Sequence, residues 1–179
     1  AAQMPFADNL FDFVFCAEVL EHIPSSNLSL VCQEIERVAS KEILIGVPYK
    51  QDIRVGRTTC YTCGKKNPPW GHVNSFDEQR IVELFRCCKI KTLSFVGETN
   101  EQTNQVSVAL MDIAGNPYGT YHQEEPCVYC GNPLLPPPKR DLSQRIATKL
   151  AVYARQFTQL FTRPRGNWMH VVLRKVGSA

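Results

Sequence analysis

The residues best suited to chemistry are four cysteines arranged in two Cys-x-x-Cys-Gly motifs. The first motif contains Cys60 and Cys63, and the second contains Cys127 and Cys130. Two intervening residues let both thiolates of a pair face one tetrahedral metal ion, and the glycine allows a tight turn that aims backbone amides at the sulfurs. Two pairs complete a closed four-thiolate set with no open position for water. The sequence therefore predicts a structural zinc site.

Three alternatives to this zinc site arise from the same residues. The cysteines could be unliganded loop residues, or either pair alone could act as a redox-active dithiol. A mixed site could use His72 or His122 in place of one cysteine. Four cysteines are favoured, because each motif supplies two thiolates without help from another side chain.

The composition indicates an ordinary soluble globular protein. Hydrophobic residues make up 44% of the 179 residues and charged residues 21%, and the net charge of +3 does not by itself imply a nucleic acid or a membrane as partner. The chain has no apolar run long enough to span a membrane, and its opening lacks the pattern of a signal peptide. The remaining cysteines lie in apolar or helical surroundings, which favours a reducing, cytoplasmic setting; they are Cys16, Cys32, Cys87 and Cys88.

Hydrophobic patterning predicts an α/β fold. Residues 11–17 are a short apolar run typical of a buried strand, and residues 41–49 are a second such run. Between them, apolar residues recur at spacings of three and four over residues 28–38, which predicts an amphipathic helix capped by Ser25 or Ser26. This order predicts a βαβ unit with parallel strands and a right-handed crossover.

The rest of the chain alternates between loops and regular elements. Residues 50–71 and 115–139 are loop-like, and residues 106–114 fit a helix or a strand equally well. The remaining predicted elements are a helix over 76–88 capped by Ser75, a strand over 90–96, a long amphipathic helix over 141–162 and a strand over 167–176.

The opening segment MPFADNLFDFVFCAEVLEHIP resembles class I S-adenosylmethionine-dependent methyltransferases of the type 11 group. The matching positions are Met4-Pro5-Phe6, Asp8, Phe11-Asp12, Val14 and Val19-Leu20-Glu21-His22. The later segment GHVNSFDEQRIVELF resembles the next helix of that family, and some bacterial members also carry a Cys-x-x-Cys-Gly motif just before it. The resemblance covers about residues 3–98 and the closing strand.

This resemblance implies a partial Rossmann-like methyltransferase sheet, the C-terminal half, with a zinc-knuckle insertion. Residues 1–99 and 166–179 would form the α/β core, and residues 100–165 an insertion with the second knuckle and the long helix. The glycine-rich cofactor loop of the family, GxGxG, is absent from the sequence, so the first half of the sheet is expected to be missing. A sheet divided in this way exposes an edge along residues 11–17, which predicts self-association.

The resemblance also implies a cofactor, S-adenosylmethionine, bound outside the carboxyl ends of the strands. Three structural alternatives remain open: strand core for Cys16 and Ala17, a solvated helix start for Glu18 and Glu21, and helix-end packing for His22. Asp12 is expected to be a turn residue rather than a catalytic base. The residues that the resemblance places beside the cofactor are Gln3, Met4, Cys16, Ala17, Glu18 and His22.

Two functions are consistent with these features, and a third interpretation makes the fragment purely structural or vestigial. In the first, the chain is the C-terminal part of a methyltransferase with an unknown acceptor, inactive alone without the glycine-rich loop, and with no catalytic residue that the sequence identifies. In the second, it is a non-enzymatic zinc-stabilised module that binds RNA or protein, although the same charges also fit a solvated surface. No membrane partner is expected. The second function would use basic residues Lys65, Lys66, Lys139, Arg140, Arg163 and Arg165 and aromatic residues Tyr61, Trp70 and Tyr129.

Overall fold

The computed structural model describes residues 3–176 and forms two compact units. The first unit comprises Ala1–Gln51, Val73–Thr99 and Gly166–Ala179. The second comprises Asp52–His72 and Asn100–Arg165. The first cysteine motif therefore belongs to the same unit as the second, while the division into a methyltransferase core and an insertion stays a prediction.

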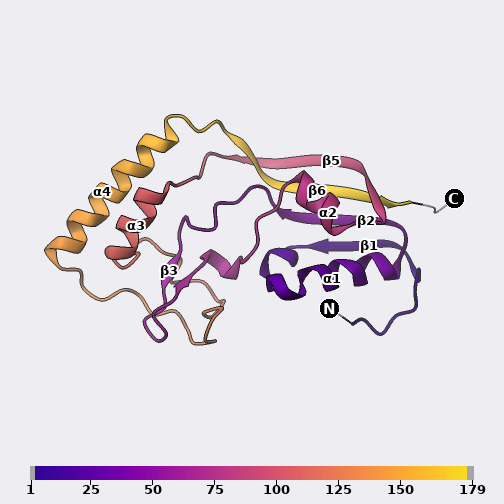
Figure 1. The fold of residues 1–179 in the computed structure, drawn as a ribbon, viewed down its shortest axis with the longest axis horizontal. Coiled ribbons are helices and arrows are strands. Elements are labelled where there is room, and N and C mark those ends of the chain that lie inside the picture. Colours follow the sequence, from indigo (N-terminus) through magenta and orange to yellow (C-terminus); the bar gives the residue numbers. More distant parts are fainter. Residues whose placement is uncertain (1–2, 177–179) are drawn as a thin grey trace. The chain divides into compact units, whose positions relative to one another are not determined.

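An open four-stranded sheet in the order β1-β2-β6-β5 forms the first unit (Figure 1). Strand β1 (Phe11–Ala17) is parallel to β2 (Ala39–Pro48), and helix α1 (Ser25–Val38) connects them. Strand β6 (Arg165–Lys175) pairs with β2 in the antiparallel sense, and β5 (Cys88–Thr99) forms the far edge. The predicted α/β class and the parallel first strand pair are confirmed.

The core of this unit lies between the sheet and the helices that pack on it. All five apolar residues of the predicted α1 stripe are buried: Leu28, Val31, Cys32, Ile35 and Val38. All of them except Val38 belong to one core cluster with residues of β2, such as Ile43 and Ile45, and with Ile81 of α2 (Glu78–Leu84). The spacing of three and four therefore identified the inward face of α1 correctly.

Both predicted serine caps are wrong. Helix α1 follows Pro24, whose carbonyl accepts hydrogen bonds from the amides of Asn27 and Leu28 at 2.8 and 3.1 Å, without any side-chain cap. Helix α2 is capped by Asp77, whose carboxylate accepts a hydrogen bond from the Arg80 amide at 2.9 Å. Asp is as good a cap as Ser, and Asp77 stands two positions closer to the first helical turn than Ser75 does.

The sequence predicted that residues 11–17 form a buried strand, but one face of this strand is exposed. Cys16 is buried, whereas Phe13 and Phe15 are 51% and 66% exposed. Successive side chains of a strand point to opposite faces, and β1 is also an edge of the sheet. An apolar run of this kind indicates burial on both faces only where helices cover both.

The second unit combines a small hairpin with a pair of helices. Residues 106–114, which the sequence left undecided, are mostly helical. The two helices are joined by hydrogen bonds from the Ser107 hydroxyl to the Ala151 carbonyl and from the Asn104 amide to the Ala154 carbonyl, both 2.8 Å long. No helix within residues 3–176 has the length and apolar character needed to cross a membrane. The elements are β3 (Thr58–Thr59), β4 (Lys66–Asn67), α3 (Gln105–Ile113) and α4 (Leu142–Gln159).

The exposed edge of β1 generates a prediction about self-association. We expect the protein to associate in a concentration-dependent way, because an unpaired strand edge with exposed phenylalanines is a template for pairing. Phe15→Lys should reduce this association, while changing the free energy of unfolding by only about 0.5 kcal/mol, as is usual for surface positions. Size-exclusion chromatography with light scattering measures the association, and Leu30→Lys, at an exposed position of α1, is the control. A wild-type protein that stays monomeric at every concentration would contradict the prediction.

Candidate functional site

The sulfurs of the four motif cysteines lie together in the second unit. Cys60 and Cys130 have their sulfurs 3.7 Å apart, and Cys63 and Cys127 have theirs 3.8 Å apart. All four sulfurs lie within 4.8 Å of one another. A tetrahedral zinc ion with bonds of about 2.3 Å places its sulfur ligands about 3.8 Å apart, whereas a disulfide requires about 2.05 Å. The spacing fits the edges of a metal tetrahedron, and all four cysteines are free.

Both motifs fold in the same way around these sulfurs. In the first, the Gly64 amide donates to the Cys60 carbonyl at 2.7 Å; in the second, the Gly131 amide donates to the Cys127 carbonyl at 2.8 Å. The two glycines have φ angles of +74° and +71°, a left-handed conformation that costs glycine little. Each first cysteine also donates its own amide to the carbonyl five residues later, at 2.9 Å in both motifs. The motifs are therefore two copies of one knuckle.

Amide groups around the cluster favour ionised sulfur. Hydrogen bonds from the side chain and the backbone of Asn132 lower the pKa of the Cys130 thiol to about 6. Burial raises the pKa of Cys60, but backbone amides, that of Cys63 first among them, outweigh burial and lower it. Burial raises the pKa of the Cys127 thiol. One thiol of each knuckle is thus predisposed to bind a cation as thiolate.

Two buried side chains fix the knuckles in place. The carbonyl oxygen of the Asn67 side chain accepts a hydrogen bond from the Val128 amide at 2.8 Å, which joins β4 to the second knuckle. The Tyr121 hydroxyl accepts from the Thr59 amide at 3.0 Å and donates to the Gly115 carbonyl at 3.1 Å. Neither residue was singled out from the sequence, because only the fold brings their partners near.

Neither of the histidines considered as alternative ligands belongs to the cluster. Among residues 3–176, the group of potential ligands around these sulfurs consists of the four cysteines, without His72 or His122.

The buried Cys16 lies in the hydrophobic core of the first unit, where burial raises the pKa of its thiol to about 11. Such a thiol is a packing group at neutral pH.

The residues that the resemblance places beside the methionine part of the cofactor lie at the carboxyl end of β1. Ala17 pairs with Gly46 of β2, and a Cβ at position 46 would stand only 2.9 Å from the Ala17 Cβ. Glu18 follows with φ of +57°, a conformation that costs a residue other than glycine roughly 1–2 kcal/mol. Its amide nevertheless donates to the Gly46 carbonyl at 3.1 Å. Backbone strain of this kind concentrates at functional sites.

Asn74 joins the two sequence segments that carry the resemblance. It is 2% exposed, and its amide group donates to the carbonyls of Leu20 and Ile23 at 2.9 and 2.6 Å. Its side-chain oxygen accepts from Arg80 at 3.1 Å. The amide of Val73 donates to the Glu21 carbonyl at 2.7 Å. The VLEH and HVNSF segments are therefore held together around one short 3-10 helix, Leu20–His22, on which His22 is half-buried.

The other predicted cofactor residues lie in the opening segment. Gln3 is exposed, and Met4 is half-buried with its amide 2.8 Å from a carboxylate oxygen of Glu34. Arg37 donates to the Met4 carbonyl at 3.1 Å and to the Asp8 carboxylate at 2.7 Å. The structure therefore ties this segment to α1, and it gives Asp8 an ion-pairing role.

Two acidic residues differ from what the sequence suggested. Asp12 was expected in a turn, but it lies within β1, where it accepts a hydrogen bond from the Ser40 hydroxyl at 2.9 Å. A solvated helix start was one open alternative for Glu21, but this residue is fully buried, and its carboxylate oxygens have no hydrogen-bond partner among residues 3–176. Burial raises the pKa of Glu21 to about 7, and the charge of Glu18 adds to the shift.

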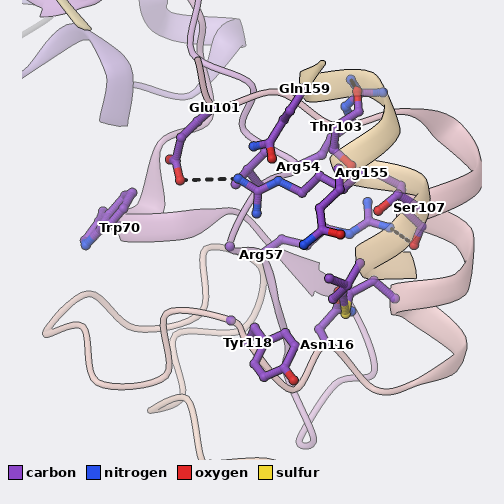
Figure 2. Close-up of a pocket in the computed structure, with 17 residues that line it drawn as sticks. Arg54, Arg57, Trp70, Glu101, Thr103, Ser107, Asn116, Tyr118, Arg155 and Gln159 are labelled. Atoms are coloured by element: carbon purple, nitrogen blue, oxygen red, sulfur yellow. Dashed lines mark hydrogen bonds and ion pairs between the residues drawn. The ribbon is translucent and has the colours of Figure 1, made fainter. Parts of the chain in front are cut away.

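A separate cavity of about 430 Å³ lies in the second unit. This volume falls within the range of roughly 300–1,000 Å³ typical of small-ligand pockets. Figure 2 shows Trp70 and Tyr118 on the side of the cavity away from the two helices. Three arginines line the cavity, and each is paired with a carboxylate: Arg54 with Asp52, Arg57 with Asp112 and Arg155 with Glu101. The pairing balances the local charge, so the cavity offers hydrogen-bond donors and aromatic rings rather than an excess of positive charge.

Comparison with known proteins supports the resemblance. The sequence model of the family described as "Methyltransferase domain" matches residues 1–43. A solved structure of a putative methyltransferase from Bacillus halodurans is 12% identical with a TM-score of 0.51, and the match covers 97% of this chain and 68% of that one. The (4+2)-cyclase SpnF is 13% identical with a TM-score of 0.45, and the match covers 97% of this chain and 53% of that one. No curated protein sequence matches this chain.

These comparisons show the fold and support the resemblance in sequence. The chain has a mixed α/β fold with an open sheet similar to that of the Bacillus halodurans structure. Its opening strand and helix match the methyltransferase family in sequence, so the resemblance to class I S-adenosylmethionine-dependent methyltransferases is confirmed. The chain spans between about half and about two thirds of the length of the two solved structures.

The buried carboxyl of Glu21 generates a prediction about pH. Its pKa of about 7 in the folded state lies above its ordinary value of 4.5, so the folded state holds this proton more tightly than the unfolded state. The contribution of Glu21 to the free energy of unfolding is therefore largest below about pH 4.5 and falls as the pH rises to about 7. Urea unfolding of the wild type and of Glu21→Gln between about pH 5 and pH 8 measures this effect.

We expect Glu21→Gln to gain stability relative to the wild type as the pH rises through this window. Glu98→Gln, at an exposed position of β5, is the matched control and should follow the wild-type profile. A difference between wild type and Glu21→Gln that is the same at every pH would show that Glu21 is charged in both states.

Proposed function

We propose that this chain is the C-terminal part of an S-adenosylmethionine-dependent methyltransferase whose acceptor is unknown. The observation that carries the proposal is the carboxyl end of β1, where the left-handed Glu18 and the close pair Ala17 and Gly46 follow the strand that matches the family in sequence. In open α/β sheets, ligands bind outside this end of the strands. The cofactor supplies an electrophilic methyl group, and methyl transfer to a good nucleophile depends mainly on positioning.

The residues of this end include a group that could bind the charged part of the cofactor. Gly46 and Ala17 are in close contact at the strand ends, and Glu18, which follows them, is exposed. Its carboxylate can accept hydrogen bonds from the ammonium group of the methionine part of the cofactor. His22 lies at the end of the following 3-10 helix, and the resemblance places it beside the reacting methyl group or the substrate. Gln3, Met4, Cys16 and Ala17 complete the proposed set.

The same proposal includes one structural zinc ion bound by Cys60, Cys63, Cys127 and Cys130. Three observations support it: the tetrahedral spacing of the sulfurs, the equivalent fold of the two knuckles and the lowered thiol pKa values of Cys60 and Cys130. Four ligands from the chain leave no position for a substrate, so the ion would stabilise the fold rather than catalyse. A set of free thiols of this kind also supports a cytoplasmic, reducing setting.

Nuclear magnetic resonance tests the cofactor site. Addition of S-adenosylhomocysteine at about millimolar concentration should shift the amide resonances of Cys16, Ala17 and Glu18 and leave the knuckles unchanged, since part of a site binds weakly but locally. Glu18→Gln should weaken this binding about tenfold, because it removes a charged hydrogen-bond acceptor. Glu98→Gln is the control. Shifts confined to the second unit, or no shifts at all, would refute the proposed site.

Metal analysis tests the zinc site separately. The purified chain should contain about one zinc ion, and Cys60→Ser or Cys127→Ser should lose it, while Cys87→Ser, at an exposed cysteine outside the cluster, should keep it. Hydrogen exchange should become faster at the knuckles after chelation, with little change in β2. A metal-free wild type with unchanged exchange after chelation would rule out a structural ion.

A further inference from the structure

Helix α4 presents its large apolar residues to solvent. Its inward residues, Ala147, Thr148 and Ala151, are small and buried. The outward residues form one stripe, at spacings of three and four, that continues into the turn after the helix. They are between 51% and 78% exposed: Leu142, Ile146, Leu150, Tyr153, Phe157, Leu160 and Phe161. We call this set the α4 stripe (Figure 1 labels the helix).

The α4 stripe does not hold the helix in place. Contact with α3 relies on small side chains and on hydrogen bonds to the carbonyls of Ala151 and Ala154. The helix start is stabilised by a capping box, in which Asp141 and Gln144 each accept a hydrogen bond from the other's amide, at 2.8 and 3.2 Å. A contiguous apolar surface that folding does not use marks an interaction site.

The basic residues in and around α4 indicate which kind of partner the α4 stripe could bind. Residues 139–165 contain seven basic residues and one acidic residue, which leaves 13 basic and 16 acidic residues in the rest of the chain. Arg155, which faces away from the stripe, pairs with Glu101. Five of the others form no ion pair with any residue of the range 3–176; they are Lys139, Arg140, Arg145, Lys149 and Arg163.

These charges border the apolar stripe. Lys149 is three residues after Ile146 and four before Tyr153, so the three side chains are neighbours on the helix surface. Arg145 is three residues after Leu142 and four before Lys149, so it is also a neighbour of both on the helix surface. Basic side chains at such a border can extend to a negatively charged layer while the apolar residues enter the layer beneath.

We propose that α4 and the turn after it bind an anionic membrane surface. A helix with an apolar face of leucine and aromatic residues and with lysine and arginine beside it lies in the plane of the lipid headgroups, with the apolar face buried roughly 5–10 Å deep. Anionic lipids attract the unpaired basic residues and increase the binding. This inference reverses the expectation of no membrane partner, which rested on the small net charge of the whole chain and on the lack of an apolar run long enough to span a membrane. It does not depend on methyl transfer.

Two other partners fit the surface less well. If a second copy of the chain bound this surface, the basic residues beside the two α4 stripes would face each other. No carboxylates would lie opposite these lysines and arginines, so the like charges would repel. RNA binding places basic groups and aromatic rings together on the contact surface, whereas Leu150, Leu160 and Ile146 occupy much of this one.

Vesicle flotation with the full 179-residue chain tests the proposal. Vesicles that contain phosphatidylserine should bind the protein, and pure phosphatidylcholine vesicles should bind it about tenfold less, with the difference reduced at high salt. Phe157→Ser should weaken binding about tenfold, since it removes one large side chain from the lipid contact. Arg145→Gln combined with Lys149→Gln should weaken binding to the anionic vesicles alone. Leu30→Ser, an exposed leucine on α1, should bind like the wild type.

The alternative outcomes are distinct from one another. Absence of binding to any vesicle, or equal binding by wild type and Phe157→Ser, would overturn the proposal. A dimer that Phe157→Ser abolishes and Phe15→Lys preserves would assign the stripe to a second copy, and tighter binding to RNA than to vesicles would assign the charges to nucleic acid. Circular dichroism and zinc content of each variant confirm that its fold is intact.

Discussion

The second unit depends on one physical constraint, the convergence of four sulfurs on a single point. The knuckles containing Cys60 and Cys127 are far apart in sequence, and the segment that carries the first is bounded on both sides by chain that belongs to the other unit. Few large apolar side chains are buried in this region, where the small cluster around the cysteines contains Tyr121 and Leu134. A unit with so small a core needs a cross-link, and the proposed zinc ion between the four cysteines would provide one.

A different constraint organises the first unit, where two strand ends meet closely. Gly46 permits the approach of β2 to Ala17, and the chain then turns through the strained Glu18 into the short helix that carries the buried Glu21. Asn74 satisfies the carbonyls of that helix from a distant segment. The strained backbone of Glu18, the buried Glu21 carboxyl without a hydrogen-bond partner among residues 3–176, and the hydrogen bonds of Asn74 thus occur together. They lie at the end of the sheet where ligands of α/β proteins bind.

Much of this structure could be predicted from sequence where local spacing carries the information. The Cys-x-x-Cys-Gly motifs specify their own turns, and the stripe of α1 specifies its buried face, so both predictions were correct. Predictions failed where the answer depends on distant segments. Nothing near Glu21 in sequence indicates that it is buried, and the apolar run of β1 does not reveal that only one of its faces is covered. Asn67 and Asn74 could not be recognised, since their partners come from other parts of the chain.

The packing of α4 has a consequence for how freely this surface can change. Because the contact with α3 rests on small residues such as Ala147 and Ala151 and on backbone carbonyls, the outer side chains are largely decoupled from folding. Substitutions on the exposed side of the helix should therefore change its binding properties while changing the free energy of unfolding little. Selection can act on binding at these positions almost independently of stability. Related chains could keep the same pair of helices and the same knuckles while presenting a quite different exterior.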